Sequence, residues 1–190
     1  MSGDLPGLGH NNGPSMDRGV TYRRYLWNKA RKDLVPTLPL FVLKMRVQRA
    51  RELGLDYKTY AGVRASTGRD VIGFLFSSNA LRMKTVRLDE GHARALDQIK
   101  DAGKVAMVHH PLVADEVAAA NVQLDAAYGA PKFTHSWTAM RDQVRGALLD
   151  QKLPRDGVLV IGDTTLEREW ADAGRTAGYL PADRYFGEMR

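Results

Sequence analysis

The sequence predicts an α/β domain built on a parallel β-sheet from about residue 70 onward. Short apolar runs at residues 71–76, 105–108 and 158–161 have the length and composition of buried strands. Each run ends in polar or turn residues, and segments of helical composition separate the runs. Strands that alternate with helices pair in parallel through right-handed crossovers, so we expect a small parallel sheet flanked by helices.

The clearest element is the strand, turn and helix of residues 157–178, with the sequence GVLVIGDTTLEREWADAGRTAG. The apolar run precedes a tight Gly-Asp-Thr-Thr turn, and the helix that follows ends in glycine. Thr164 and Glu167 have the spacing of a capping box, in which the two residues satisfy each other's backbone N–H groups. This unit is typical of Rossmann-like folds, which bind ligands at the carboxyl ends of their strands.

Two segments precede the predicted sheet. Residues 1–17 are rich in glycine, asparagine and proline, which predicts a disordered tail. Residues 18–69 predict a basic helical extension, with helices at residues 22–34, at residues 40–53 and in a short third segment. Gly54 ends the second helix, and Asp56 can cap the third helix, which stops near Gly68.

Residues 70–190 form the predicted α/β domain, in the order β-α-β-α-α-β-α. The Ala-rich composition of residues 113–128 predicts one continuous helix there. The helices expected in this domain cover, in order, residues 88–102, 113–128, 137–148 and 164–177.

The composition excludes several kinds of protein. The chain has no cysteine, which removes disulfides, thiol nucleophiles and cysteine-based zinc sites. Its longest apolar runs are far shorter than the roughly 20 residues that a membrane span needs. The N-terminus has neither a basic start nor an apolar core, unlike a secretory signal peptide. These features predict a cytoplasmic protein with no membrane partner.

Positive charge is concentrated in one part of the chain. Residues 17–70 hold 13 Lys and Arg against 5 Asp and Glu, a net charge of +8, while the whole chain carries +6. Such asymmetry indicates an anionic partner, either nucleic acid or an acidic protein. The candidate nucleic-acid contacts in this segment are Arg23, Arg24, Lys29, Arg31, Lys32, Lys44, Arg46, Arg49, Lys58 and Arg64.

The outline of helix, Gly-Leu-Asp turn and helix in residues 40–68 resembles a helix-turn-helix. One interpretation is DNA reading by its second helix. The other is a packing hairpin whose Lys and Arg side chains face solvent, because helical hairpins joined by glycine are common.

Polar residues follow each predicted strand, where the carboxyl ends of parallel strands form a binding crevice. The candidate ligand-binding residues there are Ser77, Ser78 and Asn79 after the first strand, His109 after the second, and Asp163 and Thr164 after the third. Asp163 or Thr164 can equally serve as a helix cap, and His109 as a structural histidine. Because adjacent residues of an extended chain point in opposite directions, at most one of His109 and His110 faces the crevice.

No complete catalytic or metal-binding motif accompanies these residues. Ser77, a histidine and Asp163 could be drawn as a hydrolytic triad, but the serine lacks a G-x-S-x-G elbow. The sequence has no G-x-G-x-x-G or Walker phosphate loop, and no H-x-x-x-H or H-E-x-x-H pattern. We therefore assign no catalytic residue, no metal ligand and no cofactor from the sequence.

Residues 132–178 carry four features in a fixed order. Lys132 stands ahead of a helix, residues 153–156 (LPRD) precede a strand, Gly162-Asp163 follows it, and an Ala-rich helix ends at Gly178. In this order they resemble the late motifs of the haloacid dehalogenase-like (HAD) superfamily. The resemblance implies a Rossmann-like sheet, a ligand-binding role for Lys132, and a position for Glu167 where the family has a second acidic residue of its Mg²⁺ site.

The reaction of that family needs aspartates that this chain lacks. The family's first motif places a nucleophilic aspartate after a strand and a second aspartate two residues later, where this chain has Ser77 and Asn79. His109 replaces the Ser or Thr of the second motif. The resemblance therefore implies a degenerate member without phosphoaspartyl chemistry, in which Mg²⁺ is expected only if the HAD-like site is functional.

Residues 9–14, GHNNGP, resemble a short N-terminal signature of bacterial phage-related and nucleoid-associated proteins. With the basic segment, this predicts a non-enzymatic bacterial protein that is associated with nucleic acid or regulatory, its α/β domain serving as scaffold or sensor. The alternatives are a protein–protein interaction module, or a phosphate-ligand-binding or hydrolytic HAD-like enzyme that uses the strand-end crevice.

Overall fold

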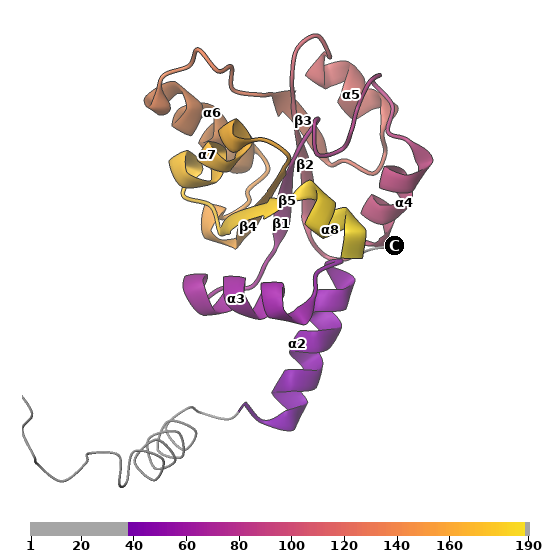
Figure 1. Cartoon of the computed structure of the whole chain (residues 1–190), viewed down its shortest axis with the longest axis vertical. Helices are drawn as coiled ribbons and strands as arrows, with labels where there is room; N and C mark the ends of the chain where they lie inside the picture. The colour runs from indigo at the N-terminus through magenta and orange to yellow at the C-terminus, as the bar shows by residue number, and fades with distance from the viewer. Residues whose placement is uncertain (1–37, 189–190) are drawn as a thin grey trace, which may run out of the picture. The chain divides into compact units, whose positions relative to one another are not determined.

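The computed structural model describes residues 38–188 and has a central sheet of five parallel strands (Figure 1). The strands are β1 (Gly73–Ser77), β2 (Gly103–Val108), β3 (Ala126–Gly129), β4 (Val158–Gly162) and β5 (Gly178–Pro181). Their order across the sheet is β3-β2-β1-β4-β5, and each neighbouring pair is parallel. The predicted α/β class with a parallel, helix-flanked sheet is confirmed.

Seven helices of the described residues surround this sheet. They are α2 (Leu40–Glu52), α3 (Tyr57–Thr67), α4 (Glu90–Gln98), α5 (Ala114–Ala120), α6 (Trp137–Asp150), α7 (Thr165–Gly174) and α8 (Ala182–Glu188), with a 3₁₀ turn at Arg155–Gly157 before β4. Within this part of the chain, no helix combines the length and the apolar character that crossing a membrane requires.

Helices cover both faces of the sheet, and the alternation of side chains along β1 decides which residues meet them. Phe74 and Phe76 point toward α4, α5 and α8, where Tyr185 packs against both rings. Leu75 points to the opposite face and packs with α6 and α7, where Trp170 is fully buried. Figure 1 shows these two helix layers on either side of the strands.

Helices α2 and α3 pack against the same apolar cluster as the first of these faces. Ala50, Leu53, Leu55 and Tyr60 are buried in one cluster with Phe74. Burial of a leucine side chain such as that of Leu53 or Leu55 stabilises the fold by about 1.5–3 kcal/mol. The two helices are therefore held to the sheet by the main core.

The turn between α2 and α3 follows the predicted signals. Gly54 has a φ of +68°, which lies in the left-handed region that glycine adopts without strain. Asp56 caps α3 by accepting a hydrogen bond from the Thr59 backbone N–H, and Gly68 ends the helix with a φ of +72°. The predictions for these three boundary residues are confirmed.

The structure corrects the secondary structure expected for residues 113–128. Only the first half is helical, as α5, and the last part forms the edge strand β3. The buried Asn121 side chain anchors the chain between them by bonding to backbone groups of Val86, Leu88 and Val117. These bonds hold residue 121 in an extended conformation, which ends the helix.

The end of the chain also differs from the prediction. The sequence predicts that the last helix runs to residue 177 and names no element after it. In the structure this helix, α7, is shorter, and strand β5 and helix α8 follow it. Helix α7 stops at Gly174 because Arg175 adopts the left-handed conformation, with a φ of +53°. Helix α4 is likewise shorter than the helix expected at residues 88–102.

Several predictions lie outside the described residues. They are the tail at residues 1–17, the helix at residues 22–34, and the candidate nucleic-acid contacts Arg23, Arg24, Lys29, Arg31 and Lys32.

Candidate functional site

The predicted crevice lies where the strand order reverses, between the carboxyl ends of β1 and β4. Strand β1 leads to β2 and β3 on one side, while β4 and β5 lie on its other side. Three segments contribute the side chains that meet here: Ser78 and Asn79 after β1, His109 after β2, and Glu167 in the first turn of α7. We refer to these four residues as the strand-end cluster.

Ser78, His109 and Glu167 form a chain of polar contacts. Ser78 Oγ lies 2.9 Å from His109 Nδ1 and accepts a hydrogen bond from the His109 backbone N–H at 3.0 Å. His109 Nε2 lies 3.6 Å from Glu167 Oε1. The tautomer with its proton on Nε2 suits both neighbours, because Nδ1 can then accept from the serine hydroxyl while Nε2–H faces the carboxylate.

Glu167 is fully buried, and N–H donors contact both of its carboxylate oxygens. Oε1 accepts a hydrogen bond from Asn79 Nδ2 at 2.8 Å. Oε2 accepts from the backbone N–H groups of Asp163 and Thr164. Thr164 Oγ1 in turn accepts from the Glu167 N–H, so the predicted capping box is confirmed. Glu167 thus joins the cap of α7 to the other three residues of the strand-end cluster.

Gly162 allows α7 to approach the end of β4 closely enough for this arrangement. A Cβ atom at this position would lie 2.7 Å from the Tyr179 ring and 2.8 Å from the Cβ of Glu167. Both distances are shorter than real Cβ contacts, so a larger residue would displace Glu167 from its donors.

His109 is held in its neutral form by its surroundings. Burial lowers the pKa of His109 below its ordinary value of 6.5, and the nearby Glu167 carboxylate partly opposes this shift. One face of the imidazole stacks on the buried indole of Trp170, with the ring centroids 5.4 Å apart. At pH 7 the ring therefore acts as a polar, uncharged link between Ser78 and Glu167.

The strand-end cluster has the residue types of a hydrolytic triad but the geometry of a structural clamp. Ser78 is only 3% exposed, and both the ring and the backbone of His109 hold its hydroxyl. The triad drawn from Ser77 and Asp163 is not formed, because Ser77 Oγ accepts a hydrogen bond from the Ala80 N–H within its own turn. The cluster ties the loops after β1 and β2 to the start of α7.

The cluster does not fit the Mg²⁺ ion that the HAD-like resemblance implies. Mg²⁺ prefers carboxylate oxygens together with water or phosphate oxygens. Glu167 supplies a carboxylate, but protein N–H groups already contact both of its oxygens. Among residues 38–188, no three His, Cys, Asp or Glu side chains gather closely enough to hold a metal ion.

The side chains of two predicted ligand-binding residues, Lys132 and Asp163, take no part in this network. The Lys132 side chain is exposed and makes no ion pair or side-chain hydrogen bond to another described residue. The exposed Asp163 side chain lines a hollow of about 400 Å³ with Thr164, Arg168 and Tyr179. The Arg168 guanidinium lies over the Tyr179 ring, 5.0 Å from its centroid.

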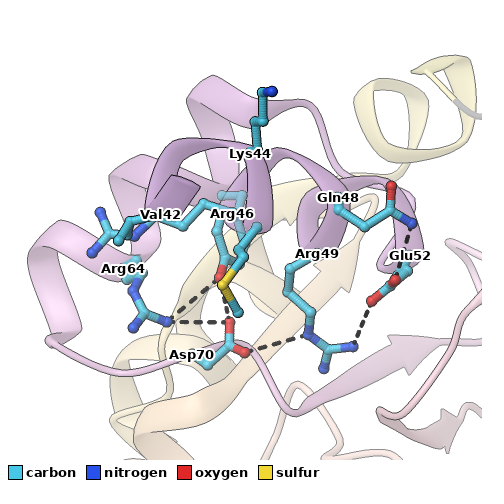
Figure 2. Close-up of a pocket in the computed structure, with 10 residues that line it drawn as sticks. Val42, Lys44, Arg46, Gln48, Arg49, Glu52, Arg64 and Asp70 are labelled. Atoms are coloured by element: carbon cyan, nitrogen blue, oxygen red, sulfur yellow. Dashed lines mark hydrogen bonds and ion pairs between the residues drawn. The ribbon is translucent and has the colours of Figure 1, made fainter. Parts of the chain in front are cut away.

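A second candidate site is an open cleft of about 650 Å³ between helices α2 and α3, here called the α2–α3 cleft (Figure 2). It brings together four of the predicted nucleic-acid contacts. The charged residues that line it are the cations Lys44, Arg46, Arg49 and Arg64 and the acids Glu52 and Asp70, so its lining carries a net positive charge.

Asp70 organises the floor of the α2–α3 cleft. Its Oδ1 atom accepts hydrogen bonds from the Tyr60 hydroxyl at 2.7 Å and from the Val71 backbone N–H at 3.0 Å. Arg49 and Arg64 approach the carboxylate from opposite sides, at 3.3 Å and 3.6 Å (Figure 2). Burial and the bond to Asp70 raise the pKa of Tyr60, so its hydroxyl remains a donor.

Arg49 has a structural role in this cleft. Besides contacting Asp70, its guanidinium donates to three backbone carbonyls, those of Val71, Lys100 and Asp101. Its side chain is only 18% exposed. These bonds hold α2 to the chain segments that lead into β1 and β2. Contacts within the protein therefore explain the position of Arg49, and no partner molecule is needed for it.

The other basic residues of the two helices make fewer or longer contacts with the protein than Arg49 does. Arg64 makes two long contacts, at 3.6 Å to Asp70 and at 3.5 Å to a tyrosine hydroxyl, and its side chain is 33% exposed. Lys44 extends away from Asp70 (Figure 2), and Lys58 is exposed on α3. Among the described residues, neither Lys44 nor Arg46 has an ion pair or a side-chain hydrogen bond.

The two sites lie at opposite ends of the sheet. Asp70 precedes β1, at the amino end of the strands, whereas Ser78 follows β1 at the carboxyl end. The sequence singles out the basic residues of the cleft but not Asp70, which positions them. The available signal is an acidic residue that stands between a basic helical segment and a buried strand.

Comparison with known protein families, with curated proteins and with solved structures finds no match for this chain. The HAD-like resemblance and the resemblance of residues 9–14 to a bacterial signature therefore stay predictions.

Proposed function

We propose that this chain is a nucleic-acid-associated protein without catalytic activity, in which helices α2 and α3 contact phosphates and the α/β domain serves as their scaffold. The observation that carries the proposal is the α2–α3 cleft. Arg46 and Lys44 line it without an ion pair to another described residue, and Arg64 is held only by long contacts. Cations of this kind can neutralise phosphates and release the counterions around them.

Two further features support the proposal. The basic residues predicted as contacts between Arg23 and Lys32 add to the positive charge of the same segment of sequence, and they lie outside the described residues. At the other end of the sheet, the strand-end cluster encloses its serine and glutamate, which favours a non-enzymatic role over the HAD-like hydrolytic alternative. Cytoplasmic location and a bacterial, phage-related origin belong to this proposal as expectations from the sequence.

The test is fluorescence anisotropy of labelled DNA and RNA with the full chain, at about 50 and 200 mM salt. We expect binding that weakens steeply with salt, because each neutralised phosphate releases condensed counterions. The variant Lys44→Glu/Arg46→Glu should bind at least tenfold more weakly and with a shallower salt dependence. Deletion of both helices is not a suitable test, since Leu53 and Tyr60 belong to the core.

The matched control is Lys84→Glu/Arg87→Glu, which makes the same change of net charge. Lys84 and Arg87 are exposed in the loop after β1 and have no ion pair among the described residues. If both double variants lose affinity equally, binding reflects net charge alone and the cleft has no part in it. Absence of any nucleic-acid binding at low salt would contradict the proposal.

A second candidate function is docking of an acidic protein partner. Phe41 and Met45 on α2 are large apolar residues that remain mostly exposed next to the cationic side chains. Apolar anchors with a charged rim are typical of protein interfaces. Pull-down of an acidic protein that competes with nucleic acid, and that the Lys44→Glu/Arg46→Glu variant fails to capture, would favour this candidate.

A further inference from the structure

We infer that the nucleic acid bound at the α2–α3 cleft is single-stranded, with an unpaired base stacked on Phe41 and a neighbouring phosphate bound by Arg64. This inference rests on the proposed function and adds the strandedness of the partner, a residue that stacks on its bases and a residue that binds its phosphates.

Phe41 lies at the start of α2 and is 71% exposed. Met45 follows four residues later, so the two side chains lie on the same face of the helix. Met45 is 56% exposed and lines the α2–α3 cleft. The phenylalanine ring therefore stands beside the basic lining, with most of its surface open to solvent.

An exposed aromatic ring beside a basic groove is the combination that single-strand binding proteins use. The groove follows the phosphates, and the ring stacks on a base, a contact worth about 1–3 kcal/mol per base. A duplex makes this contact only at the cost of unstacking its bases, which lie stacked on one another and paired inside the helix. The exposed ring of Phe41 therefore favours the binding of a strand with unpaired bases over the binding of a duplex.

The cleft can release Arg64 to a phosphate without losing its own structure. Arg64 is held by contacts of 3.5 and 3.6 Å, which are long for charge-assisted hydrogen bonds. If it turns to a phosphate, Asp70 keeps its bonds to Arg49, Tyr60 and the Val71 backbone. Arg49 holds the floor of the cleft, and Arg64 is the arginine that a ligand can recruit.

The experiment compares a single strand with a duplex of the same sequence, each about 20 nucleotides long, by anisotropy with the full chain. The single strand also carries 2-aminopurine, whose fluorescence changes when it leaves its neighbouring bases and stacks on an aromatic ring. We expect tighter binding of the single strand, and roughly tenfold weaker binding for Phe41→Ala and for Arg64→Gln. Phe41→Trp should keep the affinity of the wild type, and the change in 2-aminopurine fluorescence on binding should be lost in Phe41→Leu.

Phe133→Ala is the matched control, since Phe133 is 86% exposed in the loop before α6. It should leave the affinity and the change in 2-aminopurine fluorescence as they are in the wild type. Because Phe41 and Phe133 are both exposed, neither substitution should lower the melting temperature, which is measured alongside. For Arg64→Gln, an unchanged melting temperature separates a lost phosphate contact from a disturbed cleft.

The outcomes separate this inference from the proposed function. Equal binding of single strand and duplex, with Phe41→Ala matching the wild type, would leave nucleic-acid binding in place and overturn the inference. Binding of neither at low salt would overturn both, and would leave the acidic-protein candidate. Preferential single-strand binding that depends on Phe41 and Arg64 but not on Phe133 would support both.

Discussion

Asn79 Nδ2 donates a hydrogen bond of 2.8 Å to Glu167 Oε1, between residues that are 88 positions apart in the sequence. The bond spans the point where the strand order reverses, since Asn79 follows β1 and Glu167 lies in the first turn of the helix after β4. In a doubly wound sheet this is the usual place for a ligand. Here the protein's own donors contact the carboxylate that would otherwise face the crevice.

Substitution of Glu167 tests how much the strand-end cluster contributes to stability. Glu167→Ala removes the acceptor for two backbone N–H groups and for the Asn79 amide. We expect the free energy of unfolding to fall by about 2–4 kcal/mol, measured by urea denaturation. Glu169→Ala, on the exposed side of the same helix, should change it by less than about 0.5 kcal/mol. Similar losses for both variants would contradict the clamp.

The lowered pKa of His109 predicts a pH dependence of stability. Below pH 6.5 the unfolded chain protonates this histidine before the folded protein does, so the unfolded state binds more protons. Stability should therefore rise as the pH increases from below 6.5 through that value. In the folded protein, the ionisable group that faces the imidazole is Glu167.

Urea denaturation at about pH 5.5 and pH 7.5 measures this difference. His109→Gln should reduce the gain in stability between the two pH values, because the glutamine does not titrate. His110→Gln provides the control, since His110 is exposed beside it in sequence. If the gain in stability is unchanged in His109→Gln but reduced in His110→Gln, the pH dependence comes from His110 and the prediction for His109 is wrong.

Arg49 is predicted to stabilise the junction of α2 with the sheet. Arg49→Ala leaves Asp70 without one of its cations and three backbone carbonyls without a donor. We expect a loss of about 1–3 kcal/mol in the free energy of unfolding. Arg51→Ala changes an exposed arginine of the same helix and should be nearly neutral. Equal effects would show that helix composition matters more than these bonds.

Two glycine substitutions should have opposite signs. Gly162→Ala places a methyl group 2.7 Å from the Tyr179 ring and 2.8 Å from the Glu167 Cβ, so it should lower the melting temperature. Gly146 lies inside α6 with nothing within 4 Å of an added Cβ. Gly146→Ala should therefore raise stability by about 0.5–1 kcal/mol. Thermal unfolding of the two variants checks both, and a neutral Gly162→Ala would contradict the close approach of α7.

The long central strands and some of the helix ends could be predicted because their signals are local. Apolar runs mark β1, β2 and β4, and Asp56, Gly68 and the Thr164–Glu167 pair mark helix ends. The edge strands β3 and β5 could not, since Ala-Ala-Tyr-Gly and Gly-Tyr-Leu-Pro are too short to show a period. Alanine in β3 favours a helix locally, and pairing with β2 overrides that preference.

The candidate sites could be predicted only in part, because long-range contacts decide them. The sequence predicts Ser77 and Ser78 together as ligand-binding residues. In the structure, the Ser77 hydroxyl bonds within its own turn, whereas the Ser78 hydroxyl contacts His109. The capping pattern predicts the bonds of Glu167 to its own helix, whereas its bond to Asn79 depends on the order of the strands. Net charge likewise marks the basic segment without separating the structural Arg49 from the more available Arg64.

The brevity of β3 and β5 has a consequence for how copies of the chain meet one another. Each of these outermost strands offers four residues to a neighbour, and β5 ends at Pro181, which has no backbone N–H to donate. Short edges and an edge proline disfavour the addition of further strands, the route by which open sheets join into extended aggregates. Self-association at high concentration should therefore proceed through side chains of the helices rather than through a continuous intermolecular sheet.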